Sequence, residues 1–411
     1  MKYAAVLGYG TVGSGVVEVI ETNFDLIAKN TGDAIKVKYI VDIRDFSNDP
    51  HADLFVKDFA TVEADPEVNV VVETIGGINP AYDFTKRALK AGKSVVTSNK
   101  ELVATHGAEL LALAKENNCN YFFEASVGGG IPIIRPLCQC LAANRVDEVL
   151  GILNGTTNYI LNRMITGGLT FEAALSEAQE KGYAERNPAA DVEGHDACRK
   201  ICILSALAFG KHVYPESVVT EGITKVTLED VAYAENGDMV IKLLGRAKRT
   251  EDGKIYAFVG PHLVPKSELI SNVNGVFNAV MVRGNAVGDT VFYGRGAGKL
   301  PTASAVVADV IDACQHTDRT KYAGWEDSKE SILADSNDFV SAYYLRVSGE
   351  SVRSAVNDAF GEVSFLSRDG AKADECACIT APMSKHELDE KVKKLSQSCV
   401  VYAPMKVLAL D

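Results

Sequence analysis

The sequence has no apolar run long enough to cross a membrane. Its longest runs, such as 68–72 and 131–134, stop far short of the roughly 20 residues that a transmembrane helix requires. The N-terminal stretch MKYAAVLGYG leads directly into glycines, without the extended apolar segment or small-residue cleavage site of a secretory leader. We therefore expect a cytoplasmic protein with no membrane-spanning segment.

Positive charge is also scarce. The chain has 42 Lys and Arg against 55 Asp and Glu, which gives a formal net charge of −13, and no basic stripe interrupts this balance. A nucleic-acid surface requires clustered Lys and Arg to neutralise phosphates. This composition excludes a nucleic-acid partner and favours a small-molecule ligand.

The sequence lacks the motifs of nucleophilic and transition-metal chemistry. It has no G-x-S-x-G elbow and no H-E-x-x-H helix, and none of its nine cysteines has a recognisable partner histidine. The cysteines also lack the regular spacing of a disulfide framework, and we expect them to be reduced. Hydride transfer is left as the favoured chemistry, because it needs a nicotinamide, an oriented carbonyl and a proton donor, but no covalent intermediate.

The first motif that is present is GYGTVGSG, Gly8 to Gly15, between an apolar strand at 2–7 and an amphipathic helix at 12–23. In a dinucleotide-binding turn, Gly8 allows the tight turn, Gly10 lets the pyrophosphate approach, and Gly13 lets the helix pack closely. The helix N-terminus then faces the phosphates. The motif predicts an NAD or NADP site.

Asp42 and Arg44 follow the next predicted strand, 35–42. Asp42 stands 29 residues after Gly13, further than is usual for a ribose-binding carboxylate. An Asp favours NAD, whereas an Arg there can accept the extra phosphate of NADP. Both cofactors therefore stay open.

The pattern of strands and helices predicts an α/β protein. Strands alternate with helices up to about residue 150, which is typical of a Rossmann-type doubly wound parallel sheet. Antiparallel-looking strands follow, and the order after residue 338 is βαββαβ, typical of a ferredoxin-like unit. We expect four parts: a nucleotide domain (1–150 with helix 302–315), a mixed α/β catalytic and dimerisation domain (151–301), a linker (316–338) and a C-terminal domain (339–411).

The densest polar cluster is Gly182 to Lys200, GYAERNPAADVEGHDACRK, which precedes an apolar helix. It brings four carboxylates together, and Lys200 lies four residues after Asp196, on the same helical face. A capped, solvated helix start is the alternative interpretation. Because the apolar helix would carry Lys200 inward, we favour a proton donor among carboxylates.

Two further stretches lie where an open α/β sheet binds ligands. TSNKELVA places Lys100 just after a predicted strand, at the carboxyl edge. EASVGGGIPII, Glu124 to Ile134, exposes backbone groups to a ligand or an ion through its three glycines. A surface lysine and a flexible turn are the respective alternatives.

Residues 1–315 resemble the homoserine dehydrogenase family. The resemblance rests on seven ordered motifs: GYGTVGSG, ETIGG, TSNKELVA, EASVGGGIPII, GILNGTTNYIL, the 182–200 cluster and GRGAGKLPTASAVVADV. It implies interconversion of L-aspartate 4-semialdehyde and L-homoserine with NADP or NAD, in threonine, methionine and isoleucine biosynthesis. It also implies a homodimer or homotetramer.

The resemblance assigns roles to individual positions. It implies that Lys200 is the proton donor and acceptor, with Lys100 and Asp196 beside it. The other implied groups bind substrate (Glu185, Asp191, Gly155, Thr156), cofactor (Gly8, Gly10, Thr11, Val12, Gly13, Asp42, Arg44, Lys100, Gly298) and a sodium ion, chiefly through carbonyl oxygens (Glu124, Val127, Gly129, Ile131).

The chain departs from the family pattern in two places. Asn187 stands before Pro188 where the family usually has Asp, so we expect slightly altered substrate contacts. The C-terminal unit resembles an ACT domain, which in this family often senses threonine, but YYLRVSGESVRSAV lacks the usual Asp, Pro and Gly of the ligand turn. Both a threonine sensor and a dimerising remnant stay open. Another semialdehyde or amino-acid reductase of the same fold, and a non-catalytic NAD- or amino-acid-sensing regulator, are the alternative functions.

Overall fold

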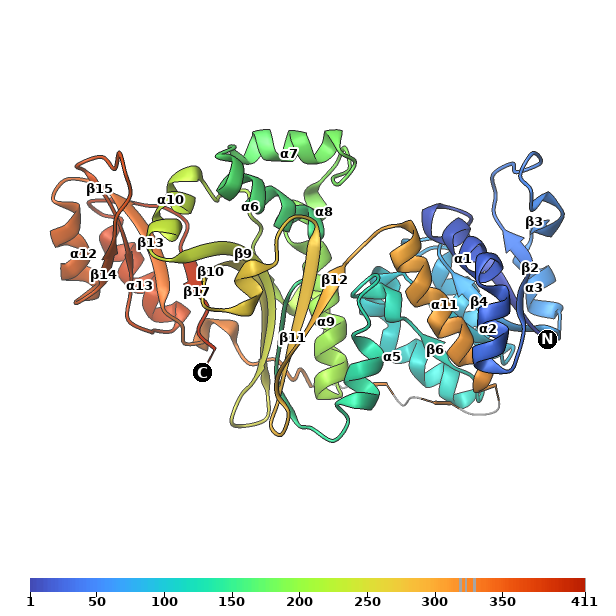
Figure 1. Ribbon diagram of the computed structural model, residues 1–411. Coiled ribbons are helices and arrows are strands. Elements are labelled where there is room, and N and C mark those ends of the chain that lie inside the picture. The colour runs from blue at the N-terminus through green and yellow to red at the C-terminus, as the bar shows by residue number, and fades with distance from the viewer. Residues whose placement is uncertain (318–319, 322–323, 328–329, 411) are drawn as a thin grey trace. The chain divides into compact units, whose positions relative to one another are not determined.

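The computed structural model describes residues 1–317, 320–321, 324–327 and 330–410 (Figure 1). These residues form two compact units, each made of three chain segments. The first unit comprises 1–146, 202–215 and 283–331, and the second comprises 147–201, 216–282 and 332–411. Our four-part division stays a prediction, and six positions of its linker, 318–319, 322–323 and 328–329, lie outside the described residues.

The first unit is built on a parallel sheet with the order β3-β2-β1-β4-β5-β6. The apolar runs of β1 and β4 are buried because helices cover both faces of such a sheet. This confirms the predicted Rossmann-type fold. The strands are β1 (Lys2–Leu7), β2 (Ile35–Val41), β3 (Phe55–Val56), β4 (Val68–Glu73), β5 (Ser94–Thr97) and β6 (Tyr121–Phe122).

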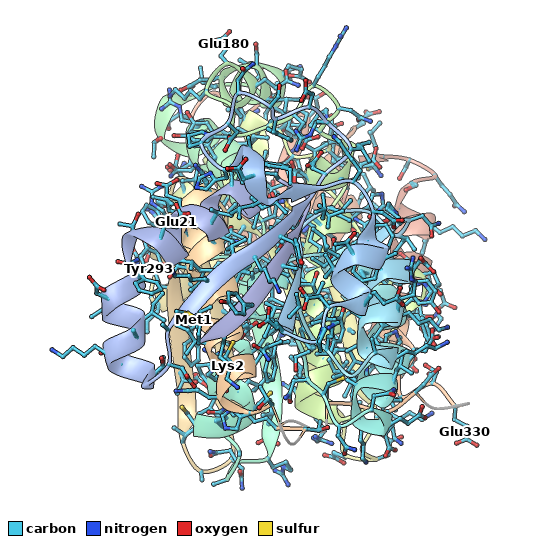
Figure 2. The ribbon with its side chains drawn as sticks, turned by 90° about the vertical axis from the view of Figure 1, so that its right-hand side faces the viewer. Met1, Lys2, Glu21, Glu180, Tyr293 and Glu330 are labelled. Carbon is cyan, nitrogen blue, oxygen red and sulfur yellow. The ribbon has the colours of Figure 1, made fainter. Side chains whose placement is uncertain are left out.

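The main helices of this unit are α1 (Thr11–Thr22), α2 (Phe24–Thr31), α3 (Phe59–Ala64), α4 (Ala81–Lys90), α5 (Lys100–Glu116) and α11 (Lys299–Gln315). Helices α1 and α11 pack closely, since a Cβ on Gly15 would lie 3.1 Å from Cβ of Ala303. Glu21, near the end of α1, lies at the surface (Figure 2). The sequence placed the start of α11 at residue 302, but the helix begins three residues earlier, because Pro301 occupies a first-turn position that needs no N–H donor.

The second unit is built on a mixed sheet with the order β11-β7-β9-β10-β17-β13-β15-β14, in which β8 also pairs with β10 and β16 with β13. Strands β9 and β10 pair antiparallel, in agreement with the antiparallel-looking strands of the sequence pattern. The strands of this sheet that precede the C-terminal module are β7 (Val146–Ile152), β8 (Val219–Thr220), β9 (Met239–Arg249), β10 (Ile255–Pro265) and β11 (Phe277–Gly284). Strand β12 (Gly288–Arg295) belongs to the first unit.

The polar cluster at 182–200 lies on α8 (Ala189–Val192) and on the first part of α9 (His195–Phe209). The second unit also contains α6 (Gly155–Gly167), α7 (Phe171–Glu180) and α10 (Leu228–Asn236). Each of α6 and α7 begins at a side-chain cap: Asn154 accepts from the N–H of Thr157, and Thr170 accepts from that of Ala173. Such caps satisfy backbone donors that would otherwise have no partner.

The C-terminal module has the predicted βαββαβ order. Its elements are β13 (Tyr343–Ser348), α12 (Val352–Phe360), β14 (Ser364–Leu366), β15 (Glu375–Ile379), α13 (Lys385–Leu395), β16 (Val400–Val401) and β17 (Met405–Val407). The sequence pattern predicts a single last strand over 399–409, which is wrong: the strand is broken between β16 and β17, where Pro404 has no N–H to donate to a ladder. The pattern also predicts a first strand over 339–347, whereas β13 begins at Tyr343.

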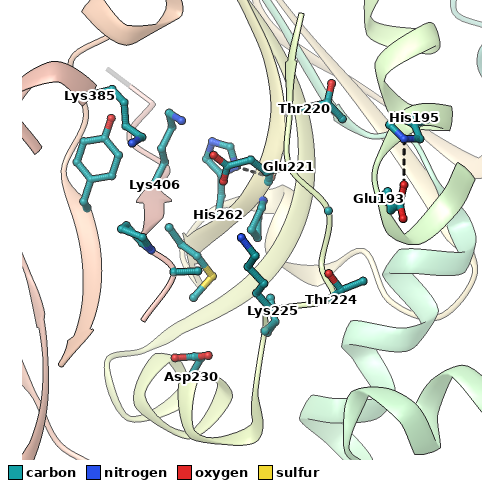
Figure 3. Close-up of a pocket in the computed structure, with 18 residues that line it drawn as sticks. Glu193, His195, Thr220, Glu221, Thr224, Lys225, Asp230, His262, Lys385 and Lys406 are labelled. Atoms are coloured by element: carbon teal, nitrogen blue, oxygen red, sulfur yellow. Dashed lines mark hydrogen bonds and ion pairs between the residues drawn. The ribbon is translucent and has the colours of Figure 1, made fainter. Parts of the chain in front are cut away.

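His262 on β10 is completely buried, at 0% exposure, among residues that line a cavity of the second unit (Figure 3). Its Nδ1 donates a hydrogen bond to the Gly260 carbonyl at 2.8 Å. Burial, together with the nearby charge of Lys406, lowers the pKa of His262 from its usual 6.5 to about 3. The imidazole is therefore neutral at physiological pH, and Nε2 is a hydrogen-bond acceptor.

This burial predicts a pH-dependent stability. Below pH 6.5 an unfolded chain binds a proton at His262 that the folded chain does not bind until about pH 3, so stability is lost as the pH falls through this window. The slope is about 1.4 kcal/mol per pH unit. Thermal unfolding of wild type and His262→Leu between pH 7 and pH 4 measures it: the Tm of wild type minus that of the variant should decrease as the pH falls. A gap that stays constant would contradict this prediction.

Candidate active site

The glycine turn of the first unit has no room for side chains. A Cβ on Gly13 would lie 1.9 Å from the carbonyl oxygen of Gly8, which itself has a φ of +88°. Gly10 is the N-cap of α1, and Thr11 and Val12 are its first two residues. Their N–H groups have no acceptor within the helix and point from its N-terminus, which suits the phosphates of a dinucleotide.

Asp42 binds the glycine turn and Arg44 at the same time. Its carboxylate accepts from the N–H of Tyr9 at 2.7 Å and from Nε and Nη2 of Arg44 at 3.0 and 2.8 Å. The Arg44 hydrogen bonds hold the pKa of Asp42 well below its usual range. The Asp42 side chain is buried, but that of Arg44 is 56% exposed, so the guanidinium is accessible to a ligand.

A buried glutamate links the C-terminal ends of β4 and β5. Glu73, at 0% exposure, accepts from the Thr97 hydroxyl at 2.6 Å and from the N–H of Ile75 at 2.7 Å, and its burial raises its pKa. Asn99 is the N-cap of α5 and donates to the Gly77 carbonyl at 2.6 Å. Lys100 is thereby fixed as the first residue of α5, at the edge where the sequence predicted it.

In the second unit, Lys200 and Asp196 form a buried ion pair one helical turn apart on α9, with Nζ 2.9 Å from Oδ2. Both side chains are less than a tenth exposed. Lys200 also donates to the Leu153 carbonyl at 2.8 Å. A buried lysine that is paired in this way can exchange a proton with a substrate at a fixed position.

Asn154 joins this pair to a second carboxylate. Its Nδ2 donates to Oδ1 of Asp191 at 2.6 Å and to Oδ2 of Asp196 at 2.9 Å, while its Oδ1 caps α6. One amide therefore fixes the start of a helix and the positions of two acids. The sequence-based reasoning missed Asn154, although an Asn before a helix is a visible capping signal.

The other predicted substrate residues lie around α6 and α8. Gly155 begins α6 in a close contact, since a Cβ there would lie 2.7 Å from the Val276 carbonyl. Thr156 donates to the Tyr183 carbonyl at 2.7 Å, and Glu185 is exposed. Asn187 accepts from the N–H of Ala189 at 3.4 Å, ahead of α8. Among the predicted groups of this unit, Lys200 pairs with Asp196, and Asn154 joins Asp196 to Asp191, whereas Lys100 lies in the other unit.

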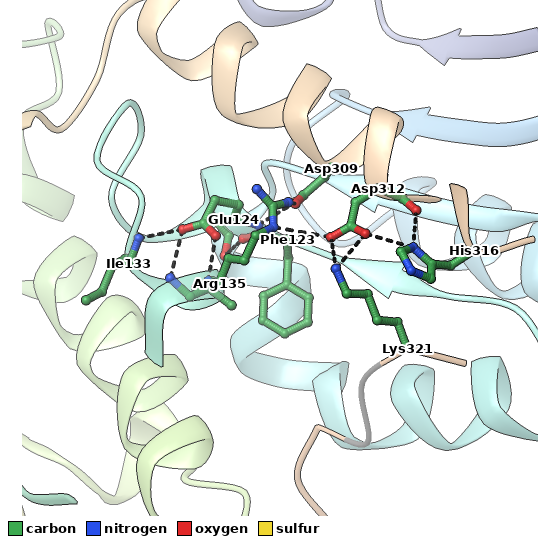
Figure 4. A network of polar contacts seen from close by, with 10 residues as sticks. Phe123, Glu124, Ile133, Arg135, Asp309, Asp312, His316 and Lys321 are labelled. Carbon is green, nitrogen blue, oxygen red and sulfur yellow. Dashed lines mark hydrogen bonds and ion pairs between the residues drawn. The ribbon is translucent and has the colours of Figure 1, made fainter. Parts of the chain in front are cut away.

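Glu124 organises the triple-glycine loop of the first unit (Figure 4). Its buried carboxylate accepts from three consecutive N–H groups, of residues 133–135, at 2.7 to 2.8 Å. Arg135 in turn donates to Asp309 and Asp312 on α11, at 2.5 and 3.2 Å. The loop between Glu124 and Arg135 is therefore fixed at both ends. Gly298, another predicted cofactor residue, is the N-cap of α11, with a φ of +124°.

The structure also bears on metal ligation, disulfides and membrane insertion. In the described ranges of the chain, no group of three or more His, Cys, Asp and Glu side chains is placed to hold a metal ion. All nine cysteines, which lie within the described residues, are free thiols. No helix among these residues combines the length and the apolar character needed to cross a membrane.

A parallel sheet with a dinucleotide-binding turn and a buried Lys–Asp pair define a nicotinamide-dependent oxidoreductase. Two family models match the chain: "Homoserine dehydrogenase, NAD binding domain" over residues 8–124 and "Homoserine dehydrogenase" over 132–311. The chain belongs to the homoserine dehydrogenase family, and it is an NAD(P)-dependent oxidoreductase.

Individual homoserine dehydrogenases are similar to this chain in sequence and in structure. The homoserine dehydrogenase of Pseudomonas aeruginosa is 47% identical over 75% of this chain and 71% of its own length. That of Neisseria gonorrhoeae is 42% identical over 95% of this chain and 89% of its own length. The crystal structure of a homoserine dehydrogenase from Thiobacillus denitrificans is 36% identical, covers 100% of this chain and 99% of its own, and has a TM-score of 0.90. The structure of a hyperthermophilic archaeal homoserine dehydrogenase in complex with NADPH covers 76% of this chain and 98% of its own, with 29% identity and a TM-score of 0.65.

Proposed function

We propose that the chain interconverts L-homoserine and L-aspartate 4-semialdehyde, in the biosynthesis of threonine, methionine and isoleucine. The observation that carries this proposal is the Lys200–Asp196 pair, which Asn154 and the Leu153 carbonyl hold in place. A buried, oriented lysine next to two acids suits a substrate that carries both an ammonium and a reacting oxygen. A regulator without catalysis would have no need of this arrangement.

Each residue of the site has its own role in the reaction. Lys200 as an ammonium donates a proton to the oxygen of the aldehyde as its carbonyl is reduced, and as a neutral amine it accepts one from the homoserine hydroxyl in the reverse direction. Asp196 keeps Lys200 in position, and Asp191 and Glu185 bind the substrate's ammonium. Gly155 and Thr156 shape the site at the start of α6. Lys100 stabilises the negative charge that develops on the substrate oxygen.

The dinucleotide site is formed by the glycine turn and its neighbours. The N–H groups at the start of α1 bind the pyrophosphate, Gly8, Gly10 and Gly13 admit it, and Asp42 and Arg44 select the ribose substituent. Lys100 and Gly298 extend this site at the starts of α5 and α11. When bound, the nicotinamide supplies or accepts the hydride.

Absorbance at the nicotinamide band tests the activity. Purified protein is mixed with homoserine and either NADP or NAD, and the reverse reaction is followed with aspartate 4-semialdehyde and the reduced cofactor. We expect cofactor reduction that depends on homoserine and oxidation that depends on the aldehyde. If neither direction proceeds with either cofactor, the proposal is wrong and the regulator hypothesis takes its place.

Arg44→Ala tests the choice of cofactor. The substitution removes the exposed guanidinium and also frees the Asp42 carboxylate, which attracts a ribose hydroxyl but repels a phosphate. We expect KM for NADP to rise about tenfold or more, from the loss of a charged hydrogen bond, with KM for NAD nearly unchanged. Lys38→Ala, which removes another ion-paired cation of the same unit, is the matched control. Equal losses with both cofactors would contradict phosphate recognition by Arg44.

The triple-glycine loop suits a sodium ion. Among the described residues, no donor reaches the carbonyl oxygens of Val127, Gly129 and Ile131, although all three residues are buried. Carbonyl oxygens are the ligands that such a cation prefers. The Glu124 carboxylate is already used by three N–H groups, so Glu124 would contribute through its own carbonyl or through the charge of its side chain. The ion would stabilise this loop without entering the reaction.

We assign an ACT-like, dimerising role to the C-terminal module, within a homodimer or homotetramer. Its sheet order β17-β13-β15-β14 and its two helices support this assignment. The turn after β13 has Ser351 in the left-handed region, at φ +50°, and contains neither Asp nor Pro. Repeating the activity assay with threonine tests whether the module also senses that effector.

A further inference from the structure

The chain that follows β2, from residue 43 to residue 57, packs against the glycine turn. Two of its aromatic residues, Phe46 and Phe55, stack with 4.7 Å between their ring centres. Tyr9, the second residue of the glycine turn, packs edge-on against both rings, at 5.2 and 5.1 Å. Arg44 belongs to the same segment, and its guanidinium carbon lies 5.1 Å from the centre of the Phe46 ring. The position of Arg44 therefore depends on how the 43–57 segment is held on the turn.

His51 connects the 43–57 segment to both the glycine turn and α1. Its Nε2 lies 3.0 Å from each carboxylate oxygen of Glu21, near the end of α1. Its Nδ1 lies 2.9 Å from Oδ1 of Asp49, in the same segment, and 3.2 Å from the hydroxyl oxygen of Tyr9. One imidazole ring therefore contacts three separate parts of the predicted dinucleotide site.

Both ring nitrogens of His51 face carboxylate oxygens, so the geometry requires a proton on each nitrogen. A neutral imidazole has one N–H and one lone pair, and that lone pair would face a carboxylate and repel it, whereas an imidazolium donates to both acids. Asp49 stays ionised, because the hydrogen bond from the backbone N–H of His51 lowers its pKa. Tyr9 stays a neutral phenol, because its burial and the nearby acids raise its pKa. His51 is therefore positively charged in this arrangement.

The charges around His51 favour its protonated form. Partial burial lowers the pKa of His51, but the hydrogen bonds and charges of Glu21 and Asp49 outweigh this effect and raise it above its usual 6.5. Within the described ranges of the chain, no lysine or arginine pairs with Glu21 or Asp49. Glu18, one turn earlier on α1, is paired with Lys299 at 2.6 Å. Of the described cations, His51 alone offsets the charges of Glu21 and Asp49.

We propose that His51, as an imidazolium, is a positioning residue that holds the 43–57 segment on the glycine turn and so sets the affinity for NADP through Arg44. A neutral His51 keeps a hydrogen bond to only one of its two acids, which loosens the segment. The contribution of His51 is complete below pH 6.5 and is lost as the pH rises through the raised pKa of the folded protein. The effect through Arg44 rests on the proposed function, but the charge of His51 does not.

NMR of the full chain without cofactor measures the charge of His51 directly. The protein is labelled with ¹³C at histidine, and the ring signals of its seven histidines are followed between pH 5.5 and pH 9. The signal that is absent from both His51→Gln and His51→Arg belongs to His51. We expect its titration midpoint to lie above pH 6.5. A midpoint at or below pH 6.5 would overturn the proposal.

Calorimetric titration with NADP and NAD at pH 7 and pH 9, where the extra phosphate of NADP is fully ionised, measures the effect on the cofactor. We expect the wild-type Kd for NADP to rise about threefold or more over this range, the scale of a partly exposed ion pair, and the Kd for NAD to change less. His51→Arg, which stays charged, should keep its affinity at pH 9, whereas His51→Gln should bind NADP weakly at both pH values. His386→Gln is the matched control, since His386 is an exposed histidine near two acids of the other unit, Asp335 and Asp338.

Three results of the titration would overturn the role of His51 alone: a wild-type Kd for NADP that is equal at pH 7 and pH 9, an equal rise for NAD and NADP, or His51→Gln that binds NADP at pH 7 as tightly as wild type. His386→Gln with the same loss as His51→Gln would also overturn it. Wild type that binds neither dinucleotide at either pH would instead reject the proposed function, and the role of His51 together with it.

Discussion

Lys200→Ala is expected to lower kcat by about 10²- to 10⁴-fold, the usual contribution of a positioned proton donor. The side chain is buried, it is paired with Asp196 at 2.9 Å, and it donates to the Leu153 carbonyl, so a solvent molecule cannot easily take its place. Steady-state kinetics in both directions, with separate measurement of the cofactor Kd, give the result. The Kd should be nearly unchanged, because the dinucleotide site lies in the first unit.

The matched control for this variant is Lys181→Ala. Lys181 is also a lysine of the second unit that is paired with an acid one helical turn away, Glu177, at 2.5 Å, but it is half-exposed. Losing a surface ion pair costs little. Lys181→Ala should therefore leave kcat unchanged. Turnover of Lys200→Ala at the wild-type rate would remove Lys200 from the proposed catalytic role.

Asn154→Asp is expected to lower kcat about 10²-fold or more at neutral pH while α6 stays intact. An aspartate still caps the helix at Thr157, but it cannot donate to Asp191 and Asp196, and it adds a third negative charge at their side. Like charges at this distance raise a carboxyl pKa. Lowering the pH should then restore part of the activity, because the introduced carboxyl group can donate again once it is protonated.

Comparison with two other variants separates the role of Asn154 as the cap of α6 from its role in positioning Asp191 and Asp196. Asn154→Ala removes both functions, whereas Thr170→Ala removes only a cap, that of the nearby α7. Each lost cap should cost about 1 kcal/mol of stability. If Asn154→Asp kept wild-type kcat at neutral pH, or if Thr170→Ala lost kcat to the same extent, Asn154 would be a structural residue and nothing more.

The sequence was most informative where function depends on local geometry. The glycine turn could be interpreted directly, because its requirements lie within one strand–turn–helix segment: Gly13 faces the Gly8 carbonyl only five residues earlier. The pairing of Lys200 with Asp196 follows from helical spacing alone. The parallel sheet and the βαββαβ order followed in the same way from alternating strands and helices.

Contacts between distant segments could not be predicted in this way. Asn154 acts on acids 37 and 42 residues further along the chain, and nothing in its neighbourhood names those partners. The same holds for Lys406, which lies beside His262 and Tyr343 only because β17 inserts between β10 and β13. The interruption before β17 was missed for a different reason: Pro404 was visible, but its effect on strand pairing was given too little weight.

The most direct test of the account uses reduced cofactor with deuterium at the transferable position of the nicotinamide. Purified protein and aspartate 4-semialdehyde are allowed to react in ordinary water, and the homoserine is examined by mass spectrometry. The account predicts one deuterium at the carbon that bears the new hydroxyl, because the hydride moves directly to carbon while the oxygen receives its proton through Lys200. Homoserine without deuterium, or no homoserine at all, would contradict it.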